Sequence, residues 1–310
     1  MRILVTGPNG FIGSALVPRL LSAKRFQVRA AVRNPSVKLP SGCERDLVRE
    51  IGPDTDWTHA VSGVDVVVHL AGRAHVMRAT NQDALDAFRR VNVSGTLNLA
   101  AQSARAGVKR FVFLSSAKVF GDSGHYSERD TPVPTDSYGV SKYDAEQGLQ
   151  RVAAQANMEY VIIRPPLVYG PGAKANFEML IKAIEAGIPL PLAAIGNRRS
   201  FVALDNLVDF IVTCISHPAA ANEIFLVSDG EDLSTPDLIR RLAAAMSKRP
   251  RLLPVPVPVL KTAAAWIGRR GMAQRLTESL YFDTSKTSRL LGWSAPLSVD
   301  EGLRRAVAPN

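Results

Sequence analysis

The stretch RILVTGPNGFIGSAL, residues 2–16, places three glycines between an apolar run typical of a buried strand and the start of a helix. In that setting Gly7 permits a tight turn, Gly10 lets backbone amides approach a pyrophosphate, and Gly13 lets the helix pack closely on the strand. The positive end of the helix then faces the phosphates. The stretch therefore predicts a dinucleotide-binding loop rather than a glycine-rich turn without a ligand.

Strand-like and helical segments alternate through the first half of the chain. Strand-like runs recur at residues 27–32, 64–70, 110–115 and 160–164, and apolar residues recur at helical spacing between positions 83 and 106. Such alternation predicts an α/β fold, a Rossmann-like doubly wound parallel sheet with helices on both faces. We assign residues 1–165 to this NAD(P)-binding domain.

Residues 166–310 are richer in proline, with shorter segments that include helices predicted at residues 177–186 and 234–246. Ser234 is the expected cap of the second helix, and Ser298 that of a final one. We expect a smaller C-terminal substrate-binding lobe that is interleaved with the end of the sheet. The run LLPVPVPVL, residues 252–260, is interpreted as an extended packed connector or, alternatively, as a patch that contacts a membrane.

The chain of 310 residues carries a net charge of +10 but only 6% aromatic residues. No nucleic-acid-binding motif accompanies the basic residues, so we expect no nucleic acid partner and assign the charge to an anionic small substrate or to the surface. The absence of a membrane-spanning run and of a secretory signal predicts a cytoplasmic protein with no integral membrane segment. The two cysteines, Cys43 and Cys214, have no metal-binding spacing, and no metal site is predicted.

The residue that follows the second predicted strand bears on the identity of the dinucleotide. A protein that binds NAD usually presents a carboxylate there, roughly 20 residues beyond the glycines, to hold the ribose hydroxyls. Residues 27–36 read QVRAAVRNPS, with Arg33 and no carboxylate. A guanidinium suits the additional 2′-phosphate of NADP, so we expect NADP; the alternative is an exposed arginine that tolerates NAD.

A tyrosine and a lysine, Tyr138 and Lys142, stand four residues apart and share one face of a predicted helix. A free phenol has a pKa of ~10, and we expect the neighbouring ammonium to lower it and to poise Tyr138 for proton transfer. Ser115 and Ser116 end the preceding strand at the carboxyl edge of the sheet, where a hydroxyl can orient a reacting oxygen. The alternative interpretation of Tyr138 and Lys142 is that they are two surface residues on a helix without a catalytic role.

Seven blocks follow one another along nearly the whole chain: VTGPNGFIGSAL, GVDVVVHLAG, RVNVSGTLNL, FLSSAKVFGD, YGVSK, IIRPPLVYGPG and RRSFVALDNLVD. With them the sequence resembles an extended short-chain dehydrogenase/reductase of the NAD(P)-dependent epimerase/dehydratase family. The resemblance implies that Ser116, Tyr138 and Lys142 form the catalytic trio. The cofactor contacts that we expect are Gly7, Asn9, Gly10, Phe11, Ile12, Gly13, Arg33, Leu70, Ala71, Gly72, Asn92, Tyr138, Lys142 and Pro165.

Members of this family mostly act on nucleotide-linked sugars. The resemblance implies that Arg199, in the block RRSFVALDN, holds the diphosphate and that Arg275 adds a phosphate contact, although each arginine taken singly also fits a surface ion pair. Positions that match the segments around the diphosphate and the nucleotide are Asn176, Phe177, Ala193 and Ile195.

Part of the pattern is similar to a bacterial subgroup that reduces 4-keto-6-deoxy nucleotide sugars for surface polysaccharide, many of whose members are named UDP-glucose 4-epimerase. We infer that His75 and Lys118 shape the sugar site; for His75 a satisfied loop histidine is an equal alternative. Ala117 and Lys118 stand where dehydratases of the family carry an acid pair, which argues against dehydration. Leu167 stands where many sugar 4-epimerases carry asparagine, so one substrate contact expected of an epimerase is missing. The expected NADP cofactor also favours a net reduction over epimerisation.

We therefore expect an NAD(P)-dependent oxidoreductase that acts at the 4-position of a nucleotide sugar and reduces a UDP-4-keto-6-deoxy-N-acetylhexosamine. The alternatives are a UDP-sugar 4-epimerase with tightly bound NAD, a steroid or flavonoid alcohol dehydrogenase, and a non-catalytic NADP(H)-sensing protein. A homodimer through the helices at residues 83–106 and 137–156 is usual for such folds.

Overall fold

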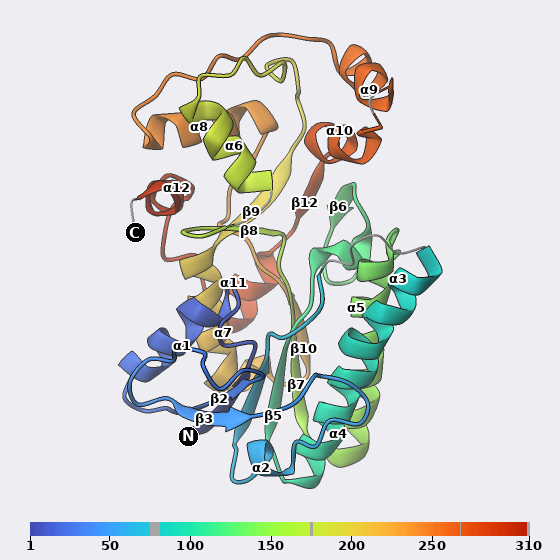
Figure 1. The fold of residues 1–310 in the computed structure, drawn as a ribbon, viewed down its shortest axis with the longest axis vertical. Coiled ribbons are helices and arrows are strands. Elements are labelled where there is room, and N and C mark those ends of the chain that lie inside the picture. Colours follow the sequence, from blue (N-terminus) through green and yellow to red (C-terminus); the bar gives the residue numbers. More distant parts are fainter. Residues whose placement is uncertain (75–80, 174–175, 267, 309–310) are drawn as a thin grey trace.

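The computed structural model describes residues 1–74, 81–173, 176–266 and 268–308. Its largest sheet is parallel and consists of β1 (Arg2–Thr6), β2 (Gln27–Val32), β3 (Glu44–Leu47), β4 (Val66–His69), β5 (Arg110–Leu114), β7 (Glu159–Arg164) and β10 (Glu223–Leu226). The strand order is β10-β7-β5-β4-β1-β2-β3, so the order reverses between β1 and β4 (Figure 1). This reversal is the mark of a doubly wound fold, and the predicted α/β class is confirmed.

Helices cover both faces of this sheet (Figure 1). The core of one face includes α1 (Gly13–Ser22) and α7 (Leu204–Ser216), and that of the other includes α2 (Thr58–Val61), α4 (Thr96–Arg105) and α5 (Ser137–Ala156). Successive residues of β1 alternate between the two cores: Ile3 and Val5 belong to the first, and Leu4 to the second. A strand buried on both faces needs apolar residues throughout, which is why β1 shows no polar alternation.

A second, smaller sheet lies toward the upper end of Figure 1. It consists of β6 (Gly124–Tyr126), β8 (Leu167–Tyr169), β9 (Arg199–Ala203), β11 (Asp232–Leu233) and β12 (Leu280–Phe282). Its core is shared with α6 (Asn176–Glu185), α8 (Thr235–Ala245) and α12 (Val299–Val307). Since β6 joins the smaller sheet and β10 the larger one, each sheet takes strands from both parts of the chain. The boundary between residues 165 and 166 stays a prediction.

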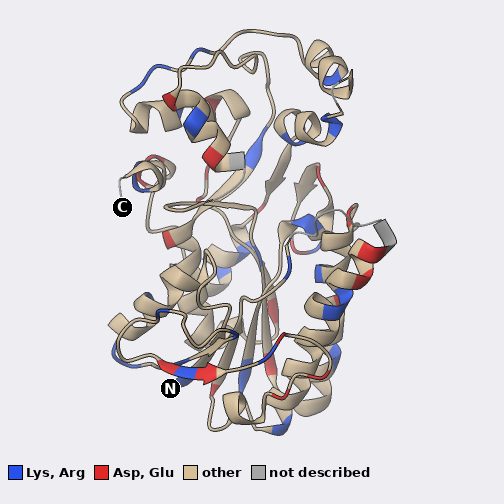
Figure 2. Cartoon of the chain, viewed as in Figure 1, with Lys and Arg blue, Asp and Glu red and all other residues tan. Residues whose placement is uncertain are grey.

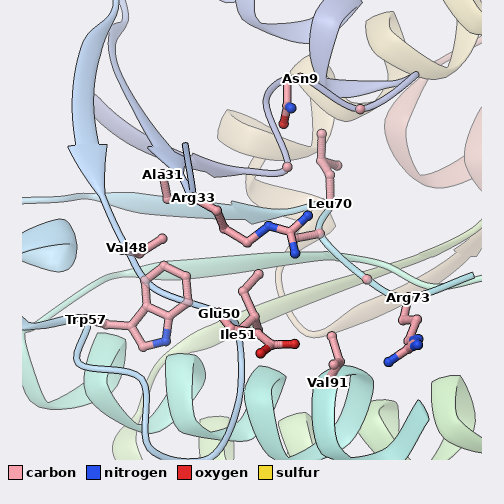
Figure 3. Close-up of a pocket in the computed structure, with 14 residues that line it drawn as sticks. Asn9, Ala31, Arg33, Val48, Glu50, Ile51, Trp57, Leu70, Arg73 and Val91 are labelled. Atoms are coloured by element: carbon pink, nitrogen blue, oxygen red, sulfur yellow. The ribbon is translucent and has the colours of Figure 1, made fainter. Parts of the chain in front are cut away.

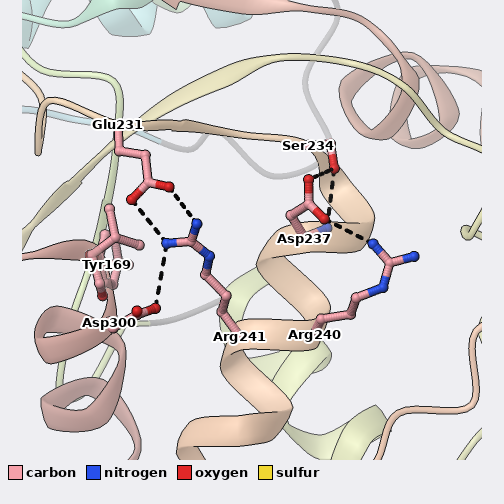
Figure 4. Close-up of polar contacts among 8 residues, drawn as sticks. Tyr169, Glu231, Ser234, Asp237, Arg240, Arg241 and Asp300 are labelled. Carbon is pink, nitrogen blue, oxygen red and sulfur yellow. Dashed lines mark hydrogen bonds and ion pairs between the residues drawn. The ribbon is translucent and has the colours of Figure 1, made fainter.

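The predicted cap of α8 is confirmed. The Ser234 hydroxyl accepts a hydrogen bond from the Asp237 backbone amide at 3.2 Å and donates one to the Asp237 carboxylate at 2.6 Å (Figure 4). In the same view, Arg241 of α8 pairs with Glu231 and, at 3.5 Å, with Asp300 of α12. These contacts join α8 to its neighbours in the lobe.

Two predicted segments differ from the structure. The helix expected at residues 83–106 is interrupted, because a π-helical turn spans Arg89–Gly95 between α3 (Asn81–Phe88) and α4. The prediction of an extended connector at residues 252–260 is wrong for its second half, because α9 (Val257–Trp266) begins there. Proline is compatible with the first turn of a helix, so Pro258 does not prevent that start. The cap predicted at Ser298, by contrast, is confirmed.

The remaining helices are α10 (Arg270–Thr277) and α11 (Ser285–Leu291). Across the described ranges, no helix is both long enough and apolar enough to cross a membrane.

Candidate active site

A cavity of about 560 Å³ opens at the carboxyl ends of β1 and β4, where the strand order reverses. Ligands of doubly wound folds bind at this position. The lining residues are Gly7, Asn9, Gly10, Ala31, Arg33, Val48, Glu50, Ile51, Trp57, Leu70, Ala71, Gly72, Arg73 and Val91 (Figure 3). Half of them, which come from the glycine loop, the end of β2 and the loop after β4, are predicted cofactor contacts.

The glycine loop has no room for a side chain at Gly7 or Gly13. A Cβ atom on Gly13 would lie 2.1 Å from the Gly7 carbonyl oxygen, and Gly7 itself has a φ of +67°. A Cβ atom on Gly7 would also lie 3.0 Å from the Ala71 backbone nitrogen. The loop therefore lies close to the start of α1 and to the loop after β4, which leaves backbone amides accessible to a pyrophosphate. This cradle fits a dinucleotide.

A buried hydrogen-bonded chain fixes the loop after β4. Thr6 Oγ1 and His69 Nδ1 lie 2.7 Å apart, His69 Nε2 and Thr96 Oγ1 lie 2.9 Å apart, and the Ala71 amide donates to Thr6 Oγ1 at 3.2 Å. Burial, together with the nearby Lys142 ammonium, lowers the pKa of His69 to about 3. The imidazole is therefore neutral at neutral pH and acts as a structural link between three elements.

Away from the glycine loop, the cavity is lined by the guanidinium of Arg33 and the carboxylate of Glu50. Figure 3 shows Arg33 and Glu50 both extending into the cavity, with Val48 and Trp57 at its wall. Arg33 was predicted from the sequence, whereas Val48, Glu50 and Trp57 were not. They follow β3 in an irregular segment, where no strand periodicity or motif marks them.

The remaining predicted cofactor residues lie around this cavity. Phe11 and Ile12 are partly buried and pack against the core beneath the glycine loop. Asn92, in the π-helical turn, is buried and accepts a hydrogen bond from the Arg73 amide at 2.8 Å. Pro165 is buried at the end of β7, and its carbonyl accepts an amide hydrogen bond from the loop after β5 at 2.9 Å.

The structure brings Ser116 and Tyr138 together. Ser116 caps the short helix Ala117–Phe120, and Tyr138 lies in the first turn of α5, its ring 5.9 Å from that of Phe88. Burial raises the pKa of Tyr138 to about 12, although a hydrogen bond with Ser116 opposes the shift. Lys142 is not among the groups that shift it, so the prediction that this ammonium lowers the phenol pKa is wrong. The phenol stays protonated at neutral pH.

Lys142 is buried at the base of the site. Its Nζ donates to the Leu114 carbonyl at 2.8 Å and lies 4.6 Å from the centre of the Phe113 ring. A Cβ atom on Gly72 would lie 3.4 Å from Nζ, which shows how close the ammonium is to the loop after β4. Burial lowers the pKa of Lys142 to about 8, while the Glu146 carboxylate opposes the shift.

Lys118 connects the serine loop to the tyrosine helix. Its Nζ pairs with Asp122 and, at 3.2 Å, with Asp136, whose other oxygen caps α5 by accepting from the Gly139 amide at 2.7 Å. Lys118 therefore holds the segment that carries Ser116 against the start of α5. Its predicted role in shaping a sugar site stays a prediction.

Two arginines converge between the smaller sheet and α10. Arg199, at the start of β9, donates to the Arg275 carbonyl at 3.0 Å and to the Glu278 carbonyl at 3.1 Å. Burial lowers the pKa of Arg199; the Asp122 carboxylate opposes the shift, and the cationic Arg275 side chain adds to it. Two cations held this close favour an anion between them.

The other predicted substrate residues are buried or partly buried, or they lie outside the residues that the structure describes. Phe177 and Ile195 are buried, and the Phe177 ring lies 5.8 Å from that of Tyr169. Ala193 is partly buried, and its amide donates to the Leu253 carbonyl at 3.1 Å. His75 lies outside the described residues, as does the Asn176 side chain.

A protein-family model described as the NAD dependent epimerase/dehydratase family matches residues 3–228. The chain belongs to this family. It is therefore an enzyme of the short-chain dehydrogenase/reductase type, and the predicted resemblance is confirmed.

Individual relatives within the epimerase/dehydratase family match almost the whole chain. A Vibrio cholerae protein named UDP-glucose 4-epimerase is 44% identical over 308 residues, which cover 98% of this chain and 93% of the relative. An Escherichia coli O157:H7 protein named N-acetyl-alpha-D-glucosaminyl-diphospho-ditrans,octacis-undecaprenol 4-epimerase is 26% identical and covers 98% and 94%. The crystal structure of UDP-glucuronic acid 4-epimerase from Bacillus cereus in complex with NAD matches with a TM-score of 0.79 at 25% identity, covering 98% of this chain and 97% of that one.

Proposed function

We propose that the protein catalyses hydride transfer at the 4-position of a UDP-sugar and that its net reaction is reduction of a UDP-4-keto-6-deoxy-N-acetylhexosamine. The observations that support the proposal are the hydrogen bond between Ser116 and Tyr138 and the closeness of Lys142 to Gly72, which lines the cavity at the ends of β1 and β4. A bound nicotinamide cofactor supplies the hydride for the keto carbon. The names of relatives that act on UDP-sugars support this substrate class.

The side chains have separate roles in this reaction. Tyr138 donates a proton to the carbonyl oxygen, for which a phenol with a pKa of about 12 is in the required protonated state. Ser116 orients that oxygen through its hydroxyl. Lys142, charged below about pH 8, holds the ribose hydroxyls of the cofactor.

We assign the substrate diphosphate to Arg199 and Arg275. The cationic Arg275 side chain adds to the lowering of the Arg199 pKa, and an anion bound beside the two arginines relieves that repulsion. No carboxylate stands at positions 117 and 118, where dehydratases carry their acid pair, so elimination of water is not part of the proposed reaction.

We propose NADP as the cofactor because Arg33 reaches into the cavity at the end of β2. The matched test compares NADPH and NADH oxidation with a UDP-4-keto-6-deoxy sugar for the wild type, Arg33→Ala and the exposed control Arg129→Ala. NADPH should be preferred, and only Arg33→Ala should lose the preference. Oxidation of neither cofactor would refute the reductase; an unchanged preference in Arg33→Ala would refute the role of Arg33.

A 4-epimerase that retains NAD is the second candidate. It is favoured by Glu50, whose carboxylate can hold ribose hydroxyls in the same cavity, and by the name of the Vibrio cholerae relative. Such an enzyme would keep NAD through purification and interconvert UDP-glucose or UDP-N-acetylglucosamine with their 4-epimers, without consuming added cofactor.

We also propose a homodimer that pairs the segment α3–α4 and α5 with their copies. Sedimentation of the purified chain tests it: a dimer mass is expected, and a monomer mass at all concentrations would exclude it. The cytoplasmic location stays a prediction.

A further inference from the structure

The helix α9 lacks the buried face that a surface helix normally has. Eight of its ten residues are apolar in VPVLKTAAAW, yet none of the ten is buried. Val259 is 55% exposed and Trp266 is 88% exposed. α9 packs against α10, and the two helices line a shallow hollow of about 490 Å³. An exposed helix of this composition indicates an interaction surface.

The run that leads from α8 to α9 extends this apolar surface. Leu253 is 48% exposed, although its backbone is fixed by hydrogen bonds with Leu190 and Ala193. In Figure 1 this run and α9 form the upper end of the molecule, away from the seven-stranded sheet. The exposed leucine, valine and tryptophan thus come from one fixed segment and the helix that follows it.

Basic residues surround this apolar surface. Residues 238–277 hold nine lysines and arginines and no aspartate or glutamate, against a net charge of +10 for the whole chain. Figure 2 shows the blue segments on the run after α8 and on α9 and α10. Among the described residues, four exposed arginines of this region form no ion pair with a carboxylate: Arg249, Arg251, Arg269 and Arg270.

We propose that this end of the molecule docks on an anionic lipid bilayer. The docking surface consists of Leu253, Val259 and Trp266 with Arg249, Arg251, Arg269 and Arg270. Apolar side chains and a tryptophan enter the interface between headgroups and acyl chains, while the arginines contact the negatively charged headgroups. The proposal is independent of the reaction assigned to the active site.

Charge decides between the bilayer and other occupants. A second copy seated on the same surface would bring two strongly basic regions together, and Glu278, which lines the hollow between α9 and α10, is already paired with Lys261, so like-charge repulsion disfavours this occupant. Nucleic acid would satisfy the arginines but would leave Leu253 and Val259 without an apolar partner. An anionic bilayer satisfies both the charged and the apolar side chains.

Trp266 provides a direct readout, because Trp57 and Trp293, the other two tryptophans, are 0% and 8% exposed. The experiment titrates the full chain with vesicles of phosphatidylcholine alone and of equimolar phosphatidylcholine and phosphatidylglycerol, following tryptophan emission and co-sedimentation. We expect a blue shift and co-sedimentation with the anionic vesicles only, both weakened by salt.

Matched variants locate the contact. At ~1 kcal/mol per basic residue near the headgroups, Arg269→Ser with Arg270→Ser should lower the partition coefficient about 30-fold. The control pair Arg129→Ser with Arg289→Ser removes the same charge from exposed positions outside the surface and should have little effect. Trp266→Gln should abolish the shift and weaken co-sedimentation.

Three results would overturn the proposal. The first is equal or absent binding to the two vesicle types. The second is a blue shift that grows with protein concentration without vesicles, which would assign the surface to a second copy. The third is a shift produced by duplex DNA but by neither vesicle, which would assign it to nucleic acid.

Discussion

Tyr138 is the residue on which the proposed chemistry depends most. We expect Tyr138→Phe to lower kcat by about 10²–10⁴-fold, because general acid catalysis is lost while the cavity is unchanged. Dinucleotide binding, measured by fluorescence titration, should remain. Tyr160→Phe, which removes a hydroxyl that accepts a hydrogen bond from Gln150 at 3.2 Å, is the control and should retain activity. Full activity in Tyr138→Phe would refute the assignment.

If Lys142 holds the cofactor ribose as proposed, dinucleotide capture depends on pH. Burial lowers the pKa of Lys142 to about 8, so its ammonium is present below that pH and is lost above it. We expect kcat/KM for the dinucleotide to be level below pH 8 and to fall about tenfold per pH unit above it. Lys142→Arg stays charged and should lose this break; a break that persists in the variant would belong to another group.

Single residues differ in how far their roles could be predicted. The glycines, Ser116, Tyr138 and Lys142 belong to short motifs with a fixed spacing, and the structure gathers them at one sheet edge. Glu50 and Trp57 reach the cavity from an irregular segment, so only the path of the chain after β3 shows their position. The phenol pKa depends on burial, which the spacing of Tyr138 and Lys142 does not reveal.

At the scale of elements, a buried ion pair joins α5 to β7. Glu146 accepts from Arg164 Nη2 at 2.6 Å and also accepts a hydrogen bond from the Ser115 hydroxyl, with both charged side chains almost fully buried. Glu146→Ala leaves the Arg164 charge unpaired and should lower the free energy of unfolding by about 3–5 kcal/mol.

Urea denaturation measures that change. The exposed pair Arg240–Asp237, at 2.8 Å and outside the proposed dimer interface, supplies the control, because Arg240→Ala should change stability by less than about 1 kcal/mol. If Glu146→Ala lowered the free energy of unfolding no more than the control does, the buried pair would not stabilise the contact between α5 and β7. Replacing both partners by leucine and methionine should recover much of the loss, since no charge is then left unpaired.

Element boundaries were largely predictable, whereas interruptions were not. The strands β1, β2, β4, β5 and β7 and the helix α5 lie within two residues of their predicted positions, because apolar runs and capping residues mark their ends. The π-helical turn that carries Asn92 lies between two α-helices, and an apolar pattern at helical spacing does not distinguish such a turn from an uninterrupted helix. The exposure of α9 was equally hidden, since an apolar sequence ordinarily predicts burial.

At the scale of the whole molecule, His69 links stability to acid. The folded pKa of about 3 lies below the unfolded value near 6.5, so the unfolded chain takes up a proton that the folded chain excludes. Stability is intact above pH 6.5 and falls as the pH decreases toward 3. Between pH 6.5 and 5 this group should remove ~2 kcal/mol from the free energy of unfolding.

Urea denaturation at several pH values checks the assignment. His69→Gln lowers stability overall by disturbing Thr6 and Thr96, but its stability should fall less steeply between pH 6.5 and 5 than that of the wild type. Identical slopes would mean that His69 does not carry the acid dependence.

The parts of the fold that the sequence did not predict are mainly strands that pair with partners far away in the sequence. Five strands of the main sheet follow from the alternation of strands and helices. β3, which follows β2 without a helix between them, and β10, which arrives after the chain has passed through the smaller sheet, were not predicted. β6 pairs with β12, with Gly124 opposite Leu280, and a two-strand contact over that separation has no local signal. The same pairing brings α10 and Arg275 toward the catalytic end of the sheet.

The reaction that we propose for this chain is reduction of the 4-keto carbon of a UDP-sugar. Its most direct test incubates the enzyme with NADPH deuterated at the transferable position and a UDP-4-keto-6-deoxy-N-acetylhexosamine, and locates the label in the product by NMR. We expect one deuterium on C4 of the sugar, formed by the wild type and by Tyr160→Phe but not by Tyr138→Phe. A product without deuterium at C4, or no product with either NADPH or NADH, would contradict the proposed reduction.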